Sequence, residues 1–192
     1  MNIGEEIVMA YLRYIKKCDF TQSNLYTPDI NGEIDVIGID IKEKKIYVCE
    51  VAIHLVTGLR YVNNKRPNNV SKLVDKFSKD IEYAKKYFSD YEIIAMLWSP
   101  TVYDRDTIWY CQLNDIKEIK KIINEKYKVE LLTIINDEFM NCLEELRDYS
   151  KKETKDNKSP IIRFMQIEEY LEKHLKNSPK EQSPQTAETS MN

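Results

Sequence analysis

"GEIDVIGIDIKEKKIYVCEVAIHL", residues 32–55, contains two apolar runs joined by a short charged turn. The runs, 33–41 and 45–55, are rich in isoleucine and valine, which predicts two β-strands joined in a hairpin. Each predicted strand carries an acid among its apolar residues, Asp35 in the first and Glu50 in the second. Core strands seldom contain carboxylates without a partner, so these two acids decide how the hairpin is interpreted.

The register of the hairpin determines whether the two acids meet. A turn at Lys42–Lys45 predicts that Asp35 lies opposite Ala52 and that Ile37 lies opposite Glu50. Because side chains alternate along a strand, both acids then project from one face as diagonal neighbours, with backbones roughly 7–8 Å apart. A register shift of two residues keeps them on that face, whereas a shift of one separates them.

Two carboxylates at this spacing are the ligand set of a hard divalent cation. Like charges in a half-buried place are unfavourable unless a positive group joins them. Mg²⁺ (or Mn²⁺) is held by a pair of carboxylates and water, and such an ion activates water and stabilises charge on a phosphoryl oxygen. The alternative is that the acids are solvated at strand ends or paired with lysines. The spacing alone does not choose between these interpretations.

Composition limits the class of protein. The chain of 192 residues has 42% apolar and 32% charged residues, as expected for one soluble domain with appendages. A net charge of −3 argues against a general attraction to phosphate, so any nucleic-acid surface must be local. The four cysteines form no CxxC pair, and only two histidines accompany them, which disfavours structural zinc and favours a reduced, cytoplasmic protein. No run is long enough to span a membrane, so no membrane partner is expected.

The order of elements predicts an α/β fold, in which a mixed central sheet has helices packed on its faces. A domain at 1–149 is followed by a charged linker at 150–160, an amphipathic helix at 161–176 and a disordered tail at 177–192. Within the domain, residues 57–69 are expected to form a polar loop. Apart from the hairpin, the apolar patterns predict helices at 3–17, 70–88, 115–127 and 137–149, and strands at 24–27, 91–99, 107–113 and 128–135.

Several short motifs resemble those of a nuclease family. Gly4–Glu5 and Tyr11–Leu12 match a first helix of the form GE…YL, Gly32–Asp35 match GEID, and Glu50–Ala52 stand where the pattern has EVK. At these residues, over about 1–98, the chain resembles the PD-(D/E)xK nuclease superfamily. Within it, the likeness is to the YraN-like predicted endonucleases and, more distantly, to archaeal Holliday-junction resolvases.

This resemblance implies a restriction-endonuclease-like αβββαβ core, here followed by C-terminal helices. It implies that Asp35 and Glu50 bind the metal, that the backbone of Val51 lies near it, and that Glu5 supports the site from the first helix. The family's lysine, which positions and polarises the attacking water, is replaced by Ala52. Removal of such a group commonly lowers the rate by about 10²–10⁴.

Other residues are candidates to supply the missing charge. In this superfamily the lysine sometimes moves to the helix after the third strand, which makes Lys76 a candidate, with Lys65 in the preceding loop as another. Both are alternatively plain surface lysines. His54 is expected on the face of Ala52 and opposite Glu33, where it serves as a proton carrier or third ligand, or simply as a hydrogen-bond partner of that glutamate.

A basic stretch follows the second strand of the hairpin and is the best local candidate for contacting phosphates. Its cationic residues, besides Lys76, are Arg60, Lys65, Arg66 and Lys72. The sequence therefore predicts a divalent-metal-dependent nuclease that hydrolyses DNA phosphodiester bonds. The alternative is a non-catalytic relative that binds nucleic acid or a protein, with a homodimer or a partner engaged through the C-terminal helix. A chance match of GEID in an unrelated α/β protein also stays open.

Overall fold

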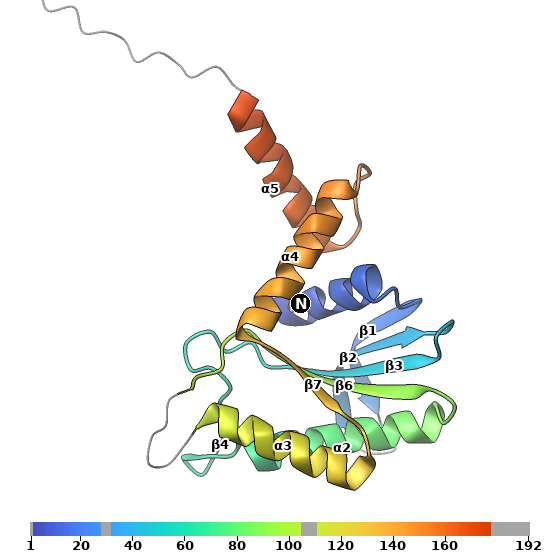
Figure 1. Cartoon of the computed structure of the whole chain (residues 1–192), viewed down its shortest axis with the longest axis vertical. Coiled ribbons are helices and arrows are strands. Elements are labelled where there is room, and N and C mark those ends of the chain that lie inside the picture. Colours follow the sequence, from blue (N-terminus) through green and yellow to red (C-terminus); the bar gives the residue numbers. More distant parts are fainter. Residues whose placement is uncertain (1, 28–31, 105–110, 178–192) are drawn as a thin grey trace, which may run out of the picture.

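A mixed five-stranded sheet forms the centre of the molecule (Figure 1). The structure is a computed structural model of the chain, and it describes residues 2–27, 32–104 and 111–177. The first three strands pair antiparallel, and β6 and β7 then continue the sheet parallel to β3. In spatial order the strands are β1 (Phe20–Thr27), β2 (Gly32–Asp40), β3 (Lys45–Val51), β6 (Glu92–Ser99) and β7 (Leu131–Ile135).

Helices cover both faces of this sheet, which makes the fold α/β with three layers. The helices α2 (Asn69–Tyr87) and α3 (Gln112–Tyr127) lie on one face, and α1 (Ile3–Ala10) and α4 (Asn136–Lys152) lie on the other (Figure 1). Two clusters of buried apolar side chains fill the spaces between the layers. An α/β fold with a mixed sheet was predicted and is confirmed at this level.

The hairpin between β2 and β3 has a different register from the one predicted. Asp40 pairs with Lys45, so the four-residue turn is Ile41–Lys44 and the pairing is shifted by two residues. Asp40 explains the shift, because its Oδ1 atom accepts a hydrogen bond of 2.8 Å from the backbone N–H of Glu43 and so caps the start of the turn. Lys44 closes the turn in the left-handed region, with φ of 51°.

Alternation along β3 assigns its side chains to the two layers. Ile46 and Val48 belong to the buried cluster on the α2 side, whereas Tyr47 and Cys49 belong to the cluster on the α1 side. Glu50 continues the first series, so the strand directs its carboxylate towards α2. The site described below depends on this direction.

The segment between β3 and α2, predicted as a polar loop, contains a small hairpin. Its strands are β4 (Val62–Asn63) and β5 (Arg66–Pro67). The two residues between them, Asn64 and Lys65, both have positive φ, 48° and 63°, which is the geometry of a tight two-residue hairpin turn. The prediction missed it because only asparagine favours this turn here, without the usual glycine.

The first helix is also more complex than predicted. After α1 the backbone continues as a π-helical segment, Tyr11–Ile15, in which the N–H of Lys16 donates to the carbonyl of Tyr11 at 3.0 Å. The wider turn accompanies packing of Tyr11 edge-to-face on Trp98, with ring centroids 5.2 Å apart. This contact holds the end of α1 against β6 of the sheet.

The remaining elements differ from prediction at their boundaries. The strand predicted at 107–113 lies mainly outside the described residues, and its last part instead begins α3, at Gln112. Helix α4 extends to Lys152, into the predicted linker, and α5 follows as Pro160–Asn177. The tail predicted to be disordered lies outside the described residues from 178 onward. Among the helices that the structure describes, none is long and apolar enough to cross a membrane.

Candidate active site

Asp35, Glu50 and Lys76 meet on the α2 side of the sheet. The Nζ atom of Lys76 lies 3.3 Å from Oδ1 of Asp35 and also contacts Oε2 of Glu50. Glu50 is fully buried, and the side chains of Asp35 and Lys76 are 18% and 23% exposed. The group is therefore open to solvent only on the side of Asp35 and Lys76.

The strand register brings the two acids together. The pairing of Val36 with Cys49, continued by one residue, sets Asp35 opposite Glu50 rather than diagonal to it. The side chain of Asp35 also bridges the strands, because its Oδ2 atom accepts a hydrogen bond of 2.8 Å from the backbone N–H of Val51. The diagonal arrangement was wrong, but both acids reach one cation, here the ammonium of Lys76.

A third acid, Asp80, belongs to the same buried group and was not among the predicted site residues. It lies one helical turn after Lys76 on α2 and is 1% exposed. Its carboxyl is close enough to share a hydrogen bond with Glu50 once either of them carries a proton. Without that proton, Oε1 of Glu50 and Oδ2 of Asp80 are buried acceptors with no hydrogen-bond donor among the described residues.

Burial controls the charge of this group. It raises the pKa of Glu50 well above its usual range, and the negative charges of Asp35 and Asp80 act in the same direction. Burial likewise raises the pKa of Asp80 to about 7. Burial alone would lower the pKa of Lys76, but attraction to Glu50 and Asp35 outweighs it and holds that pKa above its ordinary value. Lys76 is thus a stable cation, whereas the buried acids Glu50 and Asp80 keep their protons to a higher pH than usual.

Tyr61, in the loop that precedes α2, lies near enough to feel the charges of the group. Burial raises the pKa of its hydroxyl to about 12, and its titration also responds to the charges of Lys76, Glu50 and Asp35. The loop is held by Asn69, whose Oδ1 atom accepts a hydrogen bond of 2.7 Å from the backbone N–H of Tyr61. The phenol therefore contributes a neutral hydroxyl beside the charged group.

Glu5, predicted to support the site, lies next to the group but not in it. Its carboxylate accepts hydrogen bonds from Asn2, at 2.7 Å, and from Asn24, at 2.6 Å. Asn24 is the residue of β1 opposite Asp35, so Glu5 reaches the neighbouring strand. Gly4 permits this approach of α1, because a Cβ atom there would lie 2.2 Å from the side chain of Ile53.

The prediction for His54 was wrong. Strand β3 ends at Val51, and His54 lies in the following turn, exposed and 6.1 Å from the ring of Tyr61. It does not continue the alternation of β3 opposite Glu33, because the register shift and the end of the strand remove that pairing. Ala52 is buried in the apolar cluster under α2.

The predicted phosphate-contacting residues do not join the buried group. All of them are exposed, and they lie on the loop, on the β4–β5 hairpin and on the outer side of α2. Lys65 occupies the hairpin turn, so it is not a neighbour of the acids, and Lys76 is the candidate lysine that meets them. The exposed set is Arg60, Lys65, Arg66 and Lys72.

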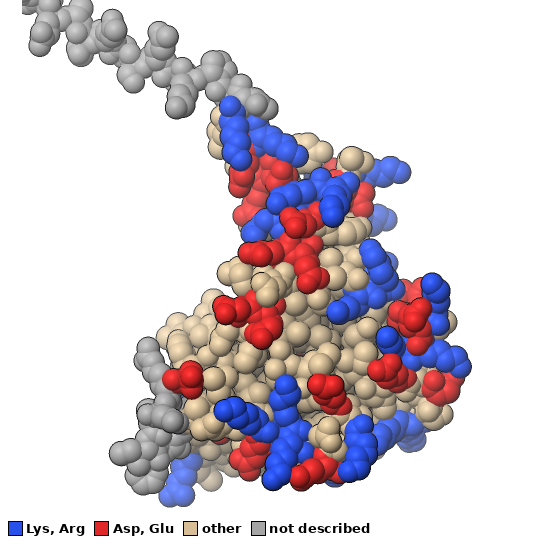
Figure 2. Space-filling model, viewed as in Figure 1, with Lys and Arg blue, Asp and Glu red and all other residues tan. Residues whose placement is uncertain are grey.

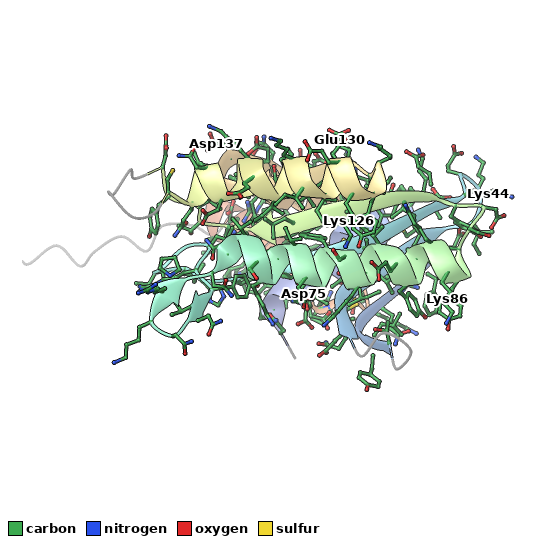
Figure 3. All side chains as sticks on the ribbon, turned by 90° about the horizontal axis from the view of Figure 1, so that it is seen from below. Lys44, Asp75, Lys86, Lys126, Glu130 and Asp137 are labelled. Carbon is green, nitrogen blue, oxygen red and sulfur yellow. The ribbon has the colours of Figure 1, made fainter. Side chains whose placement is uncertain are left out.

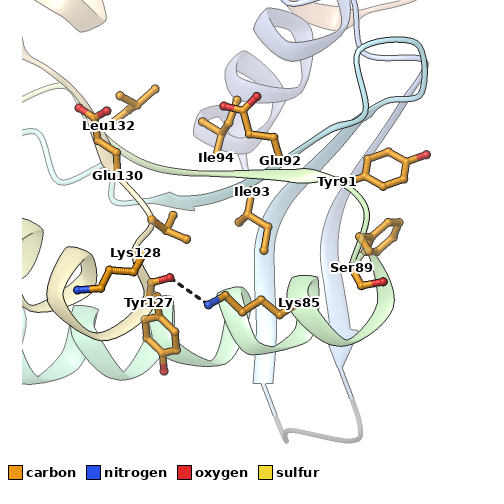
Figure 4. Close-up of a pocket in the computed structure, with 12 residues that line it drawn as sticks. Lys85, Ser89, Tyr91, Glu92, Ile93, Ile94, Tyr127, Lys128, Glu130 and Leu132 are labelled. Carbon is orange, nitrogen blue, oxygen red and sulfur yellow. Dashed lines mark hydrogen bonds between the residues drawn. The ribbon is translucent and has the colours of Figure 1, made fainter.

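The charged group lies away from a cavity near the start of β6. A cavity of about 520 Å³ lies between α2, α3 and the start of β6, where Lys85 donates a hydrogen bond of 3.0 Å to the carbonyl of Tyr127 (Figure 4). The cavity lies at the start of β6, where Glu92 pairs with Lys45, the first residue of β3. Glu50 lies near the opposite end of β3. In open α/β sheets, ligands bind at the carboxyl ends of the strands. Glu50 lies near that end of β3, so a ligand is expected beside Glu50 and not in this cavity.

The charged surface shows no extended field of one sign. Lysine and arginine alternate with aspartate and glutamate over the face drawn in Figure 2, which agrees with the net charge of −3. A polyanion would therefore be attracted by a local group of cations and not by the molecule as a whole.

Comparisons of the chain with family models, with curated proteins and with solved structures give no significant match. The interpretation of the site consequently depends on its geometry and on the motifs within this chain.

Proposed function

We propose that the protein is a divalent-metal-dependent nuclease that hydrolyses phosphodiester bonds of DNA, with a restriction-endonuclease-like core. The observation that carries the proposal is the convergence of Asp35, Glu50 and Lys76. A lysine from α2 reaches both acids, although the motif position itself is Ala52. Two carboxylates and a lysine are the residue types that the PD-(D/E)xK resemblance implies for metal binding and for positioning water.

The residues fit a magnesium ion better than a softer metal. Among the described residues there is no group of three or more His, Cys, Asp or Glu side chains that could hold a metal. Mg²⁺ needs only one or two carboxylates, because water and substrate phosphate complete its coordination. Oxygens of Asp35 and Glu50, with the backbone of Val51, would hold it, and the buried Oε1 atom of Glu50 has no hydrogen-bond donor. The ion would supply a Lewis acid and lower the pKa of water.

Each side chain has a role that follows from its charge. Asp35 accepts the N–H of Val51, which fixes its rotamer and orients its other oxygen towards the cation position. Lys76 stays protonated, so it donates hydrogen bonds to a phosphate oxygen or to the attacking water and does not act as a base. In the reaction, the water oxygen bonds to phosphorus and one bridging P–O bond breaks, leaving a phosphomonoester and a hydroxyl.

The test is a cleavage assay with the purified chain, Mg²⁺ or Mn²⁺, and duplex, branched and single-stranded DNA. Asp35→Asn and Glu50→Gln keep the shape of each side chain but remove its charge. Cleavage that requires the metal and disappears in both variants supports the proposal. Asp75→Asn, on the outer side of α2, is the matched control and retains full activity. Cleavage that persists in both site variants contradicts the proposal, because it must then come from elsewhere.

One observation favours a second candidate function. Ala52 is buried and apolar, so the position of the family's lysine has no cation. Lys76, in addition, already neutralises part of the acid charge. A non-catalytic module that binds nucleic acid would have these features. In the same assay, DNA binding without cleavage, unchanged in Asp35→Asn and Glu50→Gln, identifies this function in place of the nuclease.

A further inference from the structure

Helix α5 is attached to the domain mainly by its first two turns, with one ion pair further along, in which Glu168 lies 3.8 Å from Arg147 of α4. Ile161, Ile162 and Met165 belong to the buried cluster on the α1 side of the sheet. Gln166 completes the attachment, because its Nε2 atom donates to the carbonyls of Glu153 and Lys155 at 3.1 and 2.9 Å. Beyond this point the helix projects away from the domain (Figure 1).

The outward side of α5 carries an apolar stripe that nothing in the described part of the chain covers. Its side chains are between 54% and 63% exposed. Isolated helical segments of so few turns are marginal in water, and large exposed apolar stripes mark interaction surfaces. This stripe consists of Phe164, Ile167, Tyr170, Leu171 and Leu175.

The spacing of the stripe is that of a two-stranded coiled coil. Phe164, Ile167 and Leu171 follow one another at intervals of three and four residues, which places them at consecutive a, d and a positions. Tyr170 and Leu175 then flank this seam at g and e positions. Such a pattern is buried by one further helix of the same kind.

Two other occupants fit the stripe poorly. The 15 residues after Asn177 in the sequence contain Ala187 and Met191 as their only apolar side chains besides proline, too few to cover it. A membrane surface is disfavoured by charge, because the helix carries as many acids as bases over 163–176, not counting its histidine, whereas interfacial helices are typically basic.

We propose that α5 is a dimerisation helix whose stripe packs against that of a second copy of this chain, in parallel orientation. The charges beside the seam support this choice. In a parallel pair, a g residue meets the e residue five positions later in the partner, which sets Arg163 beside Glu168. An antiparallel pair joins e with e and g with g, so these opposite charges do not meet. Each of these two residues also has a partner in its own chain, Asp156 for Arg163 and, at 3.8 Å, Arg147 for Glu168. The guanidinium has further donors and the carboxylate further acceptor sites for a second copy.

The proposal does not depend on the proposed nuclease function, and its test needs no substrate. Sedimentation and light scattering of the full chain over a range of concentrations should show a mass that rises towards twice that of the monomer. Ile167→Ser combined with Leu171→Ser removes the centre of the stripe and should leave a monomer. The matched control, Glu172→Ser with Lys176→Ser, removes an exposed i,i+4 ion pair that lies outside the stripe and should leave dimerisation unchanged.

A cysteine experiment determines the orientation. The native cysteines in the described residues are buried and free, so they give little background. Phe164→Cys at the seam should form a disulfide-linked dimer on oxidation, because a parallel pair brings the two copies of position 164 together. Lys173→Cys, away from the seam, should not. A monomer at every concentration overturns the proposal, as does a dimer in which Phe164→Cys does not cross-link or which survives the double serine variant. Circular dichroism of each variant shows that the domain is folded.

Discussion

Helix α2 carries two acid–lysine pairs with the same spacing and opposite surroundings. Lys76 and Asp80 lie on its inner side, in the buried group with Glu50. Asp75 and Lys79 are likewise four residues apart, but they lie on the outer side, where their side chains are 59% and 39% exposed and their charged atoms are 3.2 Å apart. Figure 3 looks onto this outer side and shows Asp75 at the surface.

The two pairs differ in the physical effect of their charges. The outer pair stabilises the helix by a few tenths of a kcal/mol, as exposed i,i+4 pairs do. On the inner side, burial raises the pKa of Asp80 to about 7. Burial alone would lower the pKa of Lys76, but the attraction of Glu50 and Asp35 outweighs it and keeps Lys76 charged. Perturbed titration of this kind concentrates at functional sites. The outer pair therefore supplies matched controls for every test of the inner one.

The largest expected effect is on catalysis. Lys76→Ala should lower the rate of metal-dependent DNA cleavage by about 10²–10⁴, because it removes the cation beside both acids that we propose bind the metal. Lys79→Ala, one turn along the same helix, should leave the rate within about twofold, as expected of a solvated lysine. Single-turnover cleavage of one DNA substrate measures both. Equal rates for the two variants would remove Lys76 from the site.

The sequence predicted the part of the site that follows from local periodicity. Asp35 and Glu50 were expected on one face because alternation survives a register shift of two, and the shift that occurred was of two residues. Lys76 was a candidate through the resemblance and because a helical wheel places it near the flank of the apolar stripe of α2, whereas Lys72 points away from that stripe. That its ammonium reaches both acids depends on how α2 packs on the sheet, and no local pattern gives that.

Asp80 could have been found from the helical pattern. It stands seven residues after Leu73 and one before Ile81, so a helical wheel places it within the buried apolar stripe of α2. A buried acid at such a position needs a hydrogen-bonding or charged partner. Its position therefore indicates that a further polar group of the sheet is buried beneath α2. His54 shows the opposite case. Alternation was extended past the end of β3 at Val51, where the backbone no longer has a period of two.

The next effect is on stability and its dependence on pH. Asp80 has a pKa of about 7 in the folded chain against 3.8 ordinarily, so between about pH 4 and about pH 7 the unfolded chain binds fewer protons than the folded one. The free energy of unfolding therefore falls as pH rises through this window, by up to roughly 1.4 kcal/mol per pH unit for each proton. Below the window both states are protonated, and the effect disappears.

Chemical denaturation of the metal-free protein at a series of pH values measures this slope. Asp80→Asn should flatten the profile and make the protein more stable than the wild type at high pH, because its amide carries no charge to bury. The control Asp75→Asn should reproduce the wild-type slope. A wild-type profile that rises with pH across the window contradicts the assigned burial of the acids.

Metal binding should reverse part of this loss. Mg²⁺ requires deprotonated carboxylates, so its binding should release protons and should be stronger at high pH. At one hundred times its Kd the ion should stabilise the fold by about 2.7 kcal/mol. Thermal unfolding with and without Mg²⁺ tests this in the wild type and in Asp75→Asn, which should respond alike, whereas Glu50→Gln should not respond. A response retained in Glu50→Gln would place the ion somewhere other than the inner group.

The smallest expected effect concerns DNA binding by the β4–β5 hairpin, whose cations are exposed and have no buried partner to lose. Arg66→Ala should weaken DNA binding several-fold and reduce the slope of log K against log [salt] by about 1, as for the loss of one phosphate contact. Lys126→Ala, near the end of α3 and facing α2 (Figure 3), is the control, since it removes one positive charge at a place remote from the hairpin. Salt titrations of binding, followed by fluorescence anisotropy, separate the two outcomes. If both variants lower the slope equally, the attraction to DNA comes from the net charge alone, and the hairpin makes no phosphate contact of its own.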